Sequence, residues 1–363
     1  MRILIQIILV VTLIIVCFGC DSSNKPAKGF EDEIFVVADS LEYLNIKSAL
    51  ASTFERIINT PQPEKIFTLK RISPAQVEKH KIKKNIIIAA PLNSGSYTSQ
   101  FISAIVDSSV EMKLIEDPDF IILKENLWAR NQLVAVLSAP SVDELNAKIL
   151  SNSDDLLYNF QKFSDNRLFN NLYNSKYEQK DLQGRFLRDY GWFIYVQADF
   201  HLAMNNPAEN FVWLRRAPGS EMERWIFIHW IDNASPEYLN EDSVKVIRNR
   251  VTEKFLHTSS NGGYVVVAED YFTINEVNFN NHYALFTQGL WDLNIKGMGG
   301  PFVNYVFYDE DTQRLYMLDG SVYAPKYYKR NLIQQMDVTL QSFRTEKKIS
   351  KERIEELIEA IED

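Results

Sequence analysis

The most continuous apolar run of the chain lies at its N-terminus. Apolar side chains extend from Ile3 to Phe18, interrupted only by Gln6 and Thr12, and the run ends at a glycine followed by Cys20. A basic residue, an apolar run at the short limit for spanning ~30 Å of hydrocarbon, and a small residue before cysteine are typical of a bacterial lipoprotein signal. We therefore predict that residues 1–19 are a signal peptide and that Cys20 becomes the lipid-attachment residue.

One position departs from the usual lipoprotein motif, because Cys17 stands where leucine is expected. An uncleaved signal anchor and an ordinary secretion signal are therefore the alternatives. Cys17 and Cys20 are the only two cysteines of the chain. Cleavage and acylation would remove both thiols, so we expect no disulfide and no thiol chemistry in the mature protein.

After Cys20 the pattern predicts a polar tether at 20–29 and then an α/β lobe over 30–165. Short, wholly apolar runs are typical of buried strands, and an apolar stripe at helical spacing indicates a helix between them. The capping-box pair Ser141 and Glu144 indicates the start of a further helix. The predicted strands are Ile34–Ala38, Asn85–Ala90 and Leu133–Ala139, and the helical stripe runs from Ile46 to Ile58.

The second half predicts another lobe over 185–345, after a polar linker at 166–184, and a charged amphipathic helix at 346–363. Aromatic-rich segments separated by turn residues favour an antiparallel sheet. A helix of about four turns is expected after Ser235-Pro236 or Asn240. The predicted strands are Trp192–Ala198, Asn210–Arg215, Trp225–Ile231, Tyr264–Ala268, Tyr283–Leu290, Phe302–Tyr308 and Arg314–Tyr323. The predicted fold class is α+β, with two α/β sandwich-like lobes and a mainly antiparallel sheet in the second.

Composition narrows the classes of function. Of the 363 residues, 46% are hydrophobic and 24% charged, with a formal net charge of −9. This composition is that of a folded chain rather than a disordered one, and an acidic chain is not expected to be a dedicated nucleic-acid binder. The sequence also lacks HExxH, GxSxG, GxxxxGK[ST] and CxxC motifs. We predict no catalytic residue, no metal and no cofactor.

Several weaker patterns could indicate a metal or catalytic site, but for each of them we favour a purely structural role. His201 and His229 could meet across strands near acidic residues, but histidines without ligand spacing are more often structural. Glu269-Asp270 is an acid pair of the kind that glycoside cleavage requires, yet any acidic chain offers such pairs. We expect Asp309–Thr312 to be a hairpin turn rather than a calcium loop, and Gly297–Pro301 to be a turn with positive φ rather than a phosphate loop.

The segment Tyr323–Arg330 is the candidate ligand-binding stretch, because aromatic and cationic side chains alternate there. Such side chains, with Trp291 close by in sequence, could line a cleft for an acidic glycan or a lipid headgroup. The alternative is a helix start whose tyrosine rings pack and whose cations face water. The candidate residues are Trp291, Tyr323, Lys326, Tyr327, Lys329 and Arg330.

A series of motifs resembles one family in order along the chain. In the first half these are PQPEKIFTL at Pro61–Leu69, KKNIIIA at Lys83–Ala89 and NLWARNQLV at Asn126–Val134; in the second they are NFVWLR at Asn210–Arg215, GLWDL at Gly289–Leu293, MGGPF at Met298–Phe302 and DGSVYAPKYYKR at Asp319–Arg330. With the signal before Cys20, the chain resembles an uncharacterised family of Bacteroidota envelope lipoproteins, domain of unknown function 4837, up to about Phe343. The resemblance implies a membrane-anchored lipoprotein and supplies no activity.

We therefore expect a lipoprotein held in the cell envelope by its N-terminal lipid, at the outer membrane or a periplasmic face. Its expected role is that of a non-catalytic binding or envelope-maintenance module, with an acidic glycan, a lipid headgroup or an envelope protein as partner. The alternatives are a hydrolase acting on envelope glycan or lipid, which requires a cleft with convergent carboxylates, and a structural subunit, which requires an exposed apolar patch.

Overall fold

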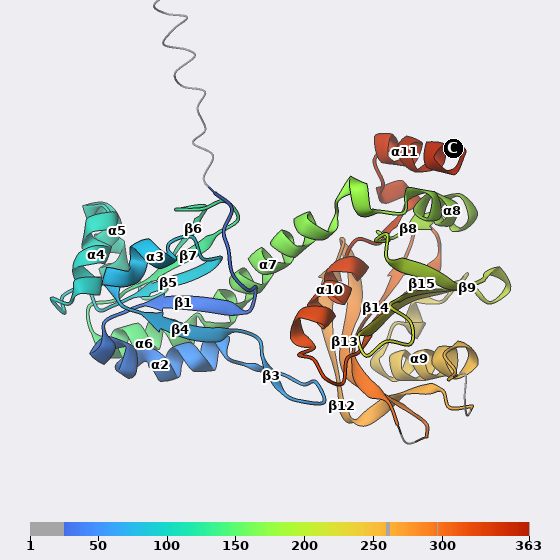
Figure 1. Ribbon diagram of the computed structural model, residues 1–363, viewed down its shortest axis with the longest axis horizontal. Helices are drawn as coiled ribbons and strands as arrows, with labels where there is room; N and C mark the ends of the chain where they lie inside the picture. Colours follow the sequence, from blue (N-terminus) through green and yellow to red (C-terminus); the bar gives the residue numbers. More distant parts are fainter. Residues whose placement is uncertain (1–24, 259–261, 296, 363) are drawn as a thin grey trace, which may run out of the picture. The chain divides into compact units, whose positions relative to one another are not determined.

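The computed structural model describes residues 25–258, 262–295 and 297–362 (Figure 1). The predicted signal peptide and Cys20 lie outside these residues. Within the described ranges, none of the helices is long and apolar enough to cross a membrane. The chain divides into two compact units, Met1–Arg56 with Phe67–Gln161, and Ile57–Ile66 with Lys162–Asp363.

The N-terminal unit is built around a five-stranded sheet in the order β4-β1-β5-β7-β6. The first four strands run parallel, and β6 pairs antiparallel with β7. Strands β1, β5 and β7 are buried on both faces, which explains their continuous apolar sequences. The strands are β1 (Glu33–Val37), β4 (Thr68–Ile72), β5 (Asn85–Ala89), β6 (Ile122–Glu125) and β7 (Leu133–Leu137).

Helices cover both faces of this sheet. Helices α2 and α6 pack against each other, and the α6 capping box of Ser141 and Glu144 is present as predicted. Ile102 of α4 and Leu114 of α5 join the core on the other face. The helices are α2 (Ser40–Phe54), α3 (Val77–His80), α4 (Tyr97–Ile105), α5 (Ser108–Glu116), α6 (Val142–Ser151) and α7 (Ser153–Leu172), the last of which crosses the division between the units.

The end of the segment predicted as a polar tether is attached to the N-terminal unit. Pro26 forms a bridge with Arg130, and Lys28 forms a bridge with Lys83. The backbone N–H of Ala27 donates to the carbonyl of Arg130 at 2.8 Å. The described part of the tether therefore lies along the unit through backbone hydrogen bonds, although its sequence has no apolar periodicity.

The C-terminal unit is built around a seven-stranded antiparallel sheet in the order β12-β13-β14-β15-β11-β10-β9. Two short antiparallel pairs, β2 with β3 and β8 with β16, accompany it. The long strands are β9 (Phe200–Asn206), β10 (Phe211–Arg216), β11 (Glu223–Asp232), β12 (Val265–Phe279), β13 (His282–Leu293), β14 (Gly299–Asp309) and β15 (Arg314–Tyr323). The short ones are β2 (Ile57–Ile58), β3 (Glu64–Lys65), β8 (Trp192–Phe193) and β16 (Arg344–Thr345).

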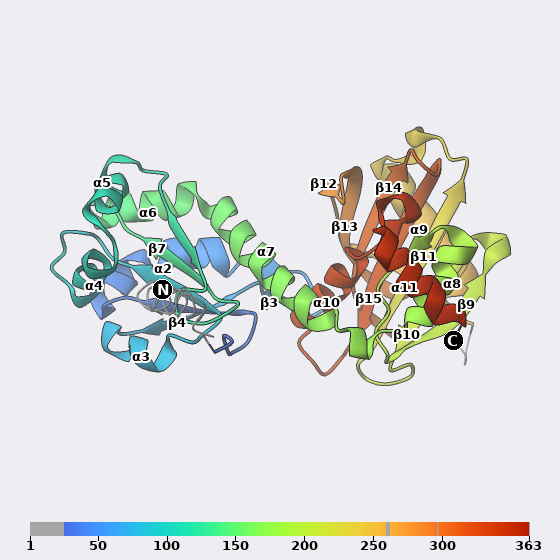
Figure 2. The ribbon, with the colours of Figure 1, turned by 90° about the horizontal axis from the view of Figure 1, so that it is seen from above.

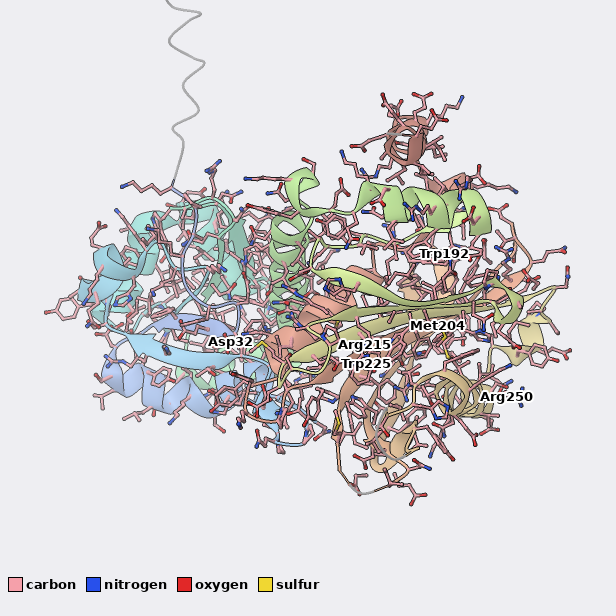
Figure 3. All side chains as sticks on the ribbon, turned by 45° about the vertical axis from the view of Figure 1, so that its right-hand side comes forward. Asp32, Trp192, Met204, Arg215, Trp225 and Arg250 are labelled. Atoms are coloured by element: carbon pink, nitrogen blue, oxygen red, sulfur yellow. The ribbon has the colours of Figure 1, made fainter. Side chains whose placement is uncertain are left out.

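Two hydrophobic cores lie on the two faces of this sheet. Alternate residues of each strand face opposite sides, so Val303 and Tyr305 of β14 join one core, whereas Phe302 and Val306 join the other. Helix α10 covers the first face and α9 the second (Figures 1 and 2). In Figure 3, Trp192 belongs to the α10 face and Trp225 to the α9 face. The helices are α8 (Lys180–Tyr190), α9 (Glu241–Phe255), α10 (Arg330–Leu340) and α11 (Lys351–Glu362).

The predicted α+β class, with a mainly antiparallel sheet in the second lobe, is confirmed. Some predicted elements differ in detail. Trp192–Ala198 was expected to be a full strand, but only Trp192 and Phe193 pair, with β16. Ile57 and Ile58 form β2 rather than the end of the first helix. The stretch 166–184, predicted as a linker, contains the end of α7 and the start of α8, and the units divide after Gln161.

A buried ion pair fixes α9 on the sheet. Arg248 of α9 donates from Nε to Asp319 of β15 at 2.7 Å, and neither side chain is exposed. Asn304 Nδ2 and Ser321 Oγ also donate to the Asp319 carboxylate, at 3.2 and 2.8 Å. The guanidinium lies 3.7 Å from the centroid of the Phe302 ring. A charge buried this deeply requires its counter-charge, so the pair determines where α9 sits.

A second buried carboxylate begins α10. Glu64, in β3, accepts hydrogen bonds from the backbone N–H groups of Lys329 and Arg330 at 2.8 to 3.0 Å. Thr60 Oγ1 donates to the same carboxylate at 3.1 Å. The first N–H groups of a helix have no partner within the helix, and an anion there is favoured by the helix dipole. Glu64, which precedes Lys329 by 265 positions, therefore caps the start of α10.

We expect Asp319→Asn to lower the free energy of unfolding of the C-terminal unit by about 3–5 kcal/mol, because it leaves the Arg248 guanidinium buried without a counter-charge. Urea unfolding followed by tryptophan fluorescence measures this, since five of the six tryptophans lie in this unit. In the double variant Arg248→Met/Asp319→Leu no charge is left buried. Its loss of unfolding free energy should therefore be smaller than the sum of the losses in Arg248→Met and Asp319→Leu. Additive losses would contradict the coupling.

We expect Glu64→Ala to destabilise the same unit by about 1–3 kcal/mol, because two buried N–H groups lose their acceptor. The matched control is Glu78→Ala, whose carboxylate is 82% exposed and pairs only with Lys81 among the described residues. That variant should change the unfolding free energy by less than about 0.5 kcal/mol. Equal effects of the two substitutions would show that the cap contributes nothing.

Candidate functional site

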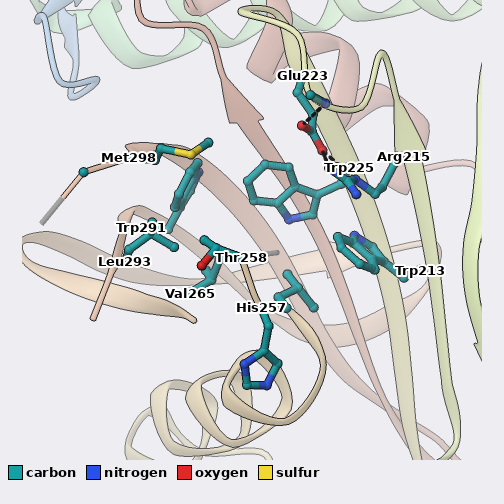
Figure 4. Close-up of a pocket in the computed structure, with 13 residues that line it drawn as sticks. Trp213, Arg215, Glu223, Trp225, His257, Thr258, Val265, Trp291, Leu293 and Met298 are labelled. Carbon is teal, nitrogen blue, oxygen red and sulfur yellow. Dashed lines mark hydrogen bonds and ion pairs between the residues drawn. The ribbon is translucent and has the colours of Figure 1, made fainter. Parts of the chain in front are cut away.

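A tryptophan-lined pocket of about 380 Å³ opens on the α9 face of the C-terminal sheet, beyond the end of α9 (Figure 4). Its volume lies in the range of small-molecule sites. Its walls come from β10, β11, β13, the start of β12, the segment after α9 and the loop before β14. The lining residues are Trp213, Arg215, Gly219, Glu223, Trp225, Leu256, His257, Thr258, Val265, Trp291, Leu293, Gly297 and Met298.

The β10–β11 hairpin supplies one wall of the pocket through strand alternation. Trp213 and Arg215 are two residues apart on β10 and so share a face, and Glu223 and Trp225 do the same on β11. The register places Arg215 directly opposite Trp225. The Trp225 and Trp291 rings approach to 4.9 Å between centroids at 60°, so the aromatic surface continues from the hairpin to β13.

Trp291 reaches its position because its neighbour on β14 has no side chain. Gly300 lies opposite Trp291, and a Cβ at Gly300 would lie 2.0 Å from the carbonyl oxygen of Val322 and 3.1 Å from the indole nitrogen. The indole Nε1–H donates to that same carbonyl at 3.2 Å. Any residue larger than glycine would therefore separate the strands at this point and displace the indole.

Arg215 and Glu223 form a fixed polar edge on the pocket. Arg215 Nε donates to Glu223 Oε1 at 2.6 Å, and the backbone N–H of Gly219 donates to Oε2 at 2.8 Å. The guanidinium also lies 4.9 Å from the centroid of the Trp213 ring. Gly219 turns at φ +75°, which glycine adopts without strain. The two charges cancel and are held in place before any ligand arrives.

This lining favours binding over bond cleavage. Among the described lining residues Glu223 is the single carboxylate, and it is already paired with Arg215. Glycoside hydrolysis requires two carboxylates about 5–9.5 Å apart. That part of the lining contains neither serine nor cysteine. The arrangement instead offers an aromatic lining with hydrogen-bonding groups at one edge, in which Trp213 is half-buried and Trp225 and Trp291 are buried.

The structure brings only one of the sequence-predicted ligand residues into this pocket. Trp291 lines it, and Tyr323 packs beside Trp291 with ring centroids 6.3 Å apart but does not line the cavity. Lys326 is exposed and pairs with Glu221 at 2.6 Å, and Tyr327 is 45% exposed. Cys20, the predicted lipid-attachment residue, lies outside the described residues.

Lys329 and Arg330 lie at the start of α10, where both are buried, with 2% and 6% of their surface exposed. Lys329 Nζ donates to the Tyr327 carbonyl at 2.9 Å, and Arg330 Nη1 donates to Gln334 at 2.6 Å. Their backbone N–H groups bind Glu64, as described above. These two cations thus neither face water nor join Trp291 in one cleft.

The weaker sequence patterns do not form a metal or catalytic cluster. His201 of β9 is the register partner of Arg215 on β10, and His229 of β11 is the register partner of Phe211. In the described ranges no group of three histidine, cysteine or acidic side chains could hold a metal. Glu269 and Asp270 are exposed and lie outside the pocket. Burial and Asp270 raise the pKa of Asp292, which also does not line the pocket.

The two predicted turns have different outcomes. Asp309–Thr312 belongs to the turn between β14 and β15, where Asp309 accepts from Thr312 Oγ1 at 2.9 Å, so the hairpin turn is confirmed. Of the Gly297–Pro301 segment, Gly297 turns with φ +155°, whereas the residues from Gly299 onward are in β14. The prediction of a turn was wrong for that part. Gly299 and Gly300 lie in a strand, and their lack of side chains lets the neighbouring strands approach closely.

The sequence reasoning missed Trp213, Arg215, Glu223, Trp225 and His257. A signal was present for Trp213, Arg215 and Trp225, which lie in the two predicted strands Asn210–Arg215 and Trp225–Ile231. Alternation places Trp213 with Arg215 on one face. Glu223 was outside the predicted strands, because β11 begins two residues before Trp225. His257 offered no such signal, since its position depends on where α9 ends.

Comparison with protein families finds two domain models in this chain. Residues 178–342 match the domain of unknown function DUF4837, and residues 27–173 match the domain of unknown function DUF8532. The resemblance to domain of unknown function 4837 is thus confirmed for the motifs of the second half. Its predicted extension over the first half was wrong, because the motifs there lie within the DUF8532 match. Comparison with curated proteins finds no match. Neither family model assigns an activity.

Proposed function

We propose that this chain, a DUF8532 domain followed by a DUF4837 domain, is a non-catalytic binding protein whose tryptophan-lined pocket holds a sugar ring of a glycan. The observation that carries the proposal is the pocket itself, with three indoles beside the Arg215–Glu223 pair. Indole faces pack against the C–H faces of a sugar ring, and charged or polar side chains at the edge form hydrogen bonds with its hydroxyl groups.

The charge of the pocket favours an uncharged ring. Arg215 is neutralised by Glu223, so among the described lining residues no lysine or arginine is left unpaired for an acidic sugar. The expectation of an acidic glycan depended on the cations of the Tyr323–Arg330 segment. Lys329 and Arg330 lie buried at the start of α10 rather than in the pocket, so they do not favour an acidic ligand there. A preformed ion pair still donates and accepts hydrogen bonds to neutral hydroxyl groups.

The alternative function, a hydrolase acting on envelope glycan or lipid, has less support. It requires convergent carboxylates with shifted pKa values. The described part of the pocket lining offers only Glu223, which three donor groups of Arg215 and Gly219 already engage. Binding without cleavage is the chemistry that these side chains support.

The second part of the proposal concerns location. We propose that the protein is a lipoprotein anchored in the cell envelope through Cys20, with the outer membrane or a periplasmic face as its site. The support is the apolar run that ends before Cys20. An acyl anchor contributes about 0.8 kcal/mol per buried CH₂, so two or three chains suffice without a membrane-spanning helix. In that compartment envelope glycans are the ligands at hand.

We expect N,N′-diacetylchitobiose, a neutral disaccharide, to bind the full chain more tightly than digalacturonate, an acidic one. Isothermal titration calorimetry measures both affinities. Trp213→Leu should weaken binding of the neutral sugar about tenfold, because it removes an aromatic face worth about 1.4 kcal/mol. The matched control is Trp128→Leu, which changes a half-buried tryptophan of the N-terminal unit and should leave the affinity unchanged.

Absence of binding by both sugars, or equal affinities for the parent chain and Trp213→Leu, would overturn the glycan proposal. Tighter binding of digalacturonate would reject the neutral ring. Chromatography of the incubated disaccharide separates binding from hydrolysis, since cleavage products would favour the hydrolase alternative.

The lipid anchor has its own experiment. The full chain is expressed in a bacterial host that processes lipoproteins and is labelled with a clickable palmitate analogue. We expect a labelled, membrane-associated product about 19 residues shorter than the full chain, and loss of label in Cys20→Ala. Cys17→Ala is the matched control and should keep the label. An unlabelled, full-length product from the parent chain would contradict the anchor.

A further inference from the structure

A second pocket of the C-terminal unit, of about 390 Å³, shares no residue with the tryptophan-lined pocket. It lies where the end of α7, the segment around β8, β16 and α11 meet. Phe169, Tyr173, Phe193 and Tyr195 give it an aromatic lining, and Arg344 lies among them.

The aromatic wall is continuous. The rings of Phe169 and Tyr173 stack with centroids 3.9 Å apart, and those of Tyr173 and Tyr195 lie 4.0 Å apart. The Tyr195 hydroxyl donates to the Leu172 carbonyl at 2.5 Å, which holds the wall to the end of α7. A flat apolar group would find complementary faces here.

Arg344 brings to this pocket a cation without a counter-charge. Its Nη1 group donates to the carbonyls of Gln341 and Phe343, both at 2.7 Å, which fixes the guanidinium. Among the described residues no carboxylate lies within 4.0 Å of it, and Nε and Nη2 make no hydrogen bond to them. The Nε–Nη2 edge is the side of a guanidinium that grips a carboxylate with two parallel hydrogen bonds.

The other charges around the pocket cancel once Lys180 of α8 is counted. Arg353 pairs with Glu178 and with Glu356, the first at 2.6 Å, and Lys180 Nζ lies 2.5 Å from Glu356 Oε1 and 3.9 Å from Glu178 Oε1. These two cations and two carboxylates sum to zero, which leaves the charge of Arg344 unbalanced, although two glutamates lie in the lining. A single negative charge can therefore be placed on Arg344, whereas a doubly charged phosphate would meet more repulsion from Glu178 and Glu356.

We propose that this pocket binds a small organic monocarboxylate with a flat apolar body, its carboxylate on the Nε–Nη2 edge of Arg344 and its body against Tyr173 and its neighbours. The proposal is independent of the glycan pocket. Burial lowers the pKa of Arg344, so the unpaired charge is itself unfavourable there and an anion relieves that cost. Burial also raises the pKa of Tyr173, which keeps its hydroxyl protonated as a neutral neighbour of the carboxylate.

Fluorine NMR titration of the full chain tests the proposal with 4-fluorobenzoate and its neutral isostere 4-fluorobenzamide. We expect 4-fluorobenzoate to bind with a Kd of about 1 mM, and 4-fluorobenzamide at least about tenfold more weakly. Arg344→Gln should weaken benzoate binding about tenfold while leaving benzamide binding unchanged. Arg185→Gln, which removes an exposed arginine of α8, is the matched control and should change neither.

A second variant avoids the hydrogen bonds that Arg344 makes to the backbone. Ser175 is exposed at the rim of the pocket, so Ser175→Trp should close the entrance and abolish benzoate binding without disturbing the core. Trp213→Leu should leave benzoate binding intact, which separates this pocket from the glycan proposal. Equal binding of 4-fluorobenzoate and 4-fluorobenzamide, tighter binding of 4-fluorophenyl phosphate, or 4-fluorobenzoate binding unaffected by both pocket variants would overturn the proposal.

Discussion

The buried pair of Arg248 and Asp319 is the constraint on which the C-terminal unit depends. Removing both groups from water carries a large cost, and only their mutual attraction with the bonds from Asn304 and Ser321 offsets it. The Phe302 ring lies against the Arg248 guanidinium, and Gly289 leaves room for that ring, since a Cβ at Gly289 would lie 2.6 Å from it. Helix α9 is therefore held in one position on the sheet.

The position of α9 decides where the tryptophan-lined pocket lies. Leu256, His257 and Thr258 follow the last turn of α9 and form one wall, while the sheet supplies the indoles. Because Trp291 depends on Gly300 and the Arg215–Glu223 pair depends on Gly219, the remaining walls are fixed by strand geometry rather than by flexible side chains. A site assembled in this way needs little reorganisation on binding, which is what a binding module requires.

Much of the fold could be predicted because buried strands and amphipathic helices leave periodic patterns. Strand β9 left none, since it is a polar edge strand with most of its side chains exposed or half-buried. The segment Trp192–Ala198 was wrongly predicted as a full strand. Its apolar residues are buried by packing, and most of them do not pair with a neighbouring strand. Burial is what the pattern reports, and hydrogen bonding follows only where a neighbouring strand is available.

The sequence pattern also could not predict which charged residues of the candidate site are buried. Trp291 could be picked out from its aromatic character, and alternation could have added Trp213 and Arg215. The burial of Lys329 and Arg330 could not be found locally, because it depends on Glu64 from a distant part of the chain. A run of lysines and arginines is usually solvated, and only a long-range carboxylate reverses that expectation.

Glu64 also shows why the family domains and the compact units differ. Residues 57–66 fall within the DUF8532 match, yet their contacts belong to the C-terminal unit, and so do those of the end of α7. A fragment limited to residues 178–342 would lack the cap of α10, the aromatic wall of Phe169 and Tyr173, and Arg344 itself. The part of the chain that matches DUF4837 is therefore completed by residues on both sides of the match, and the stability and the second pocket of the C-terminal unit depend on those residues as well.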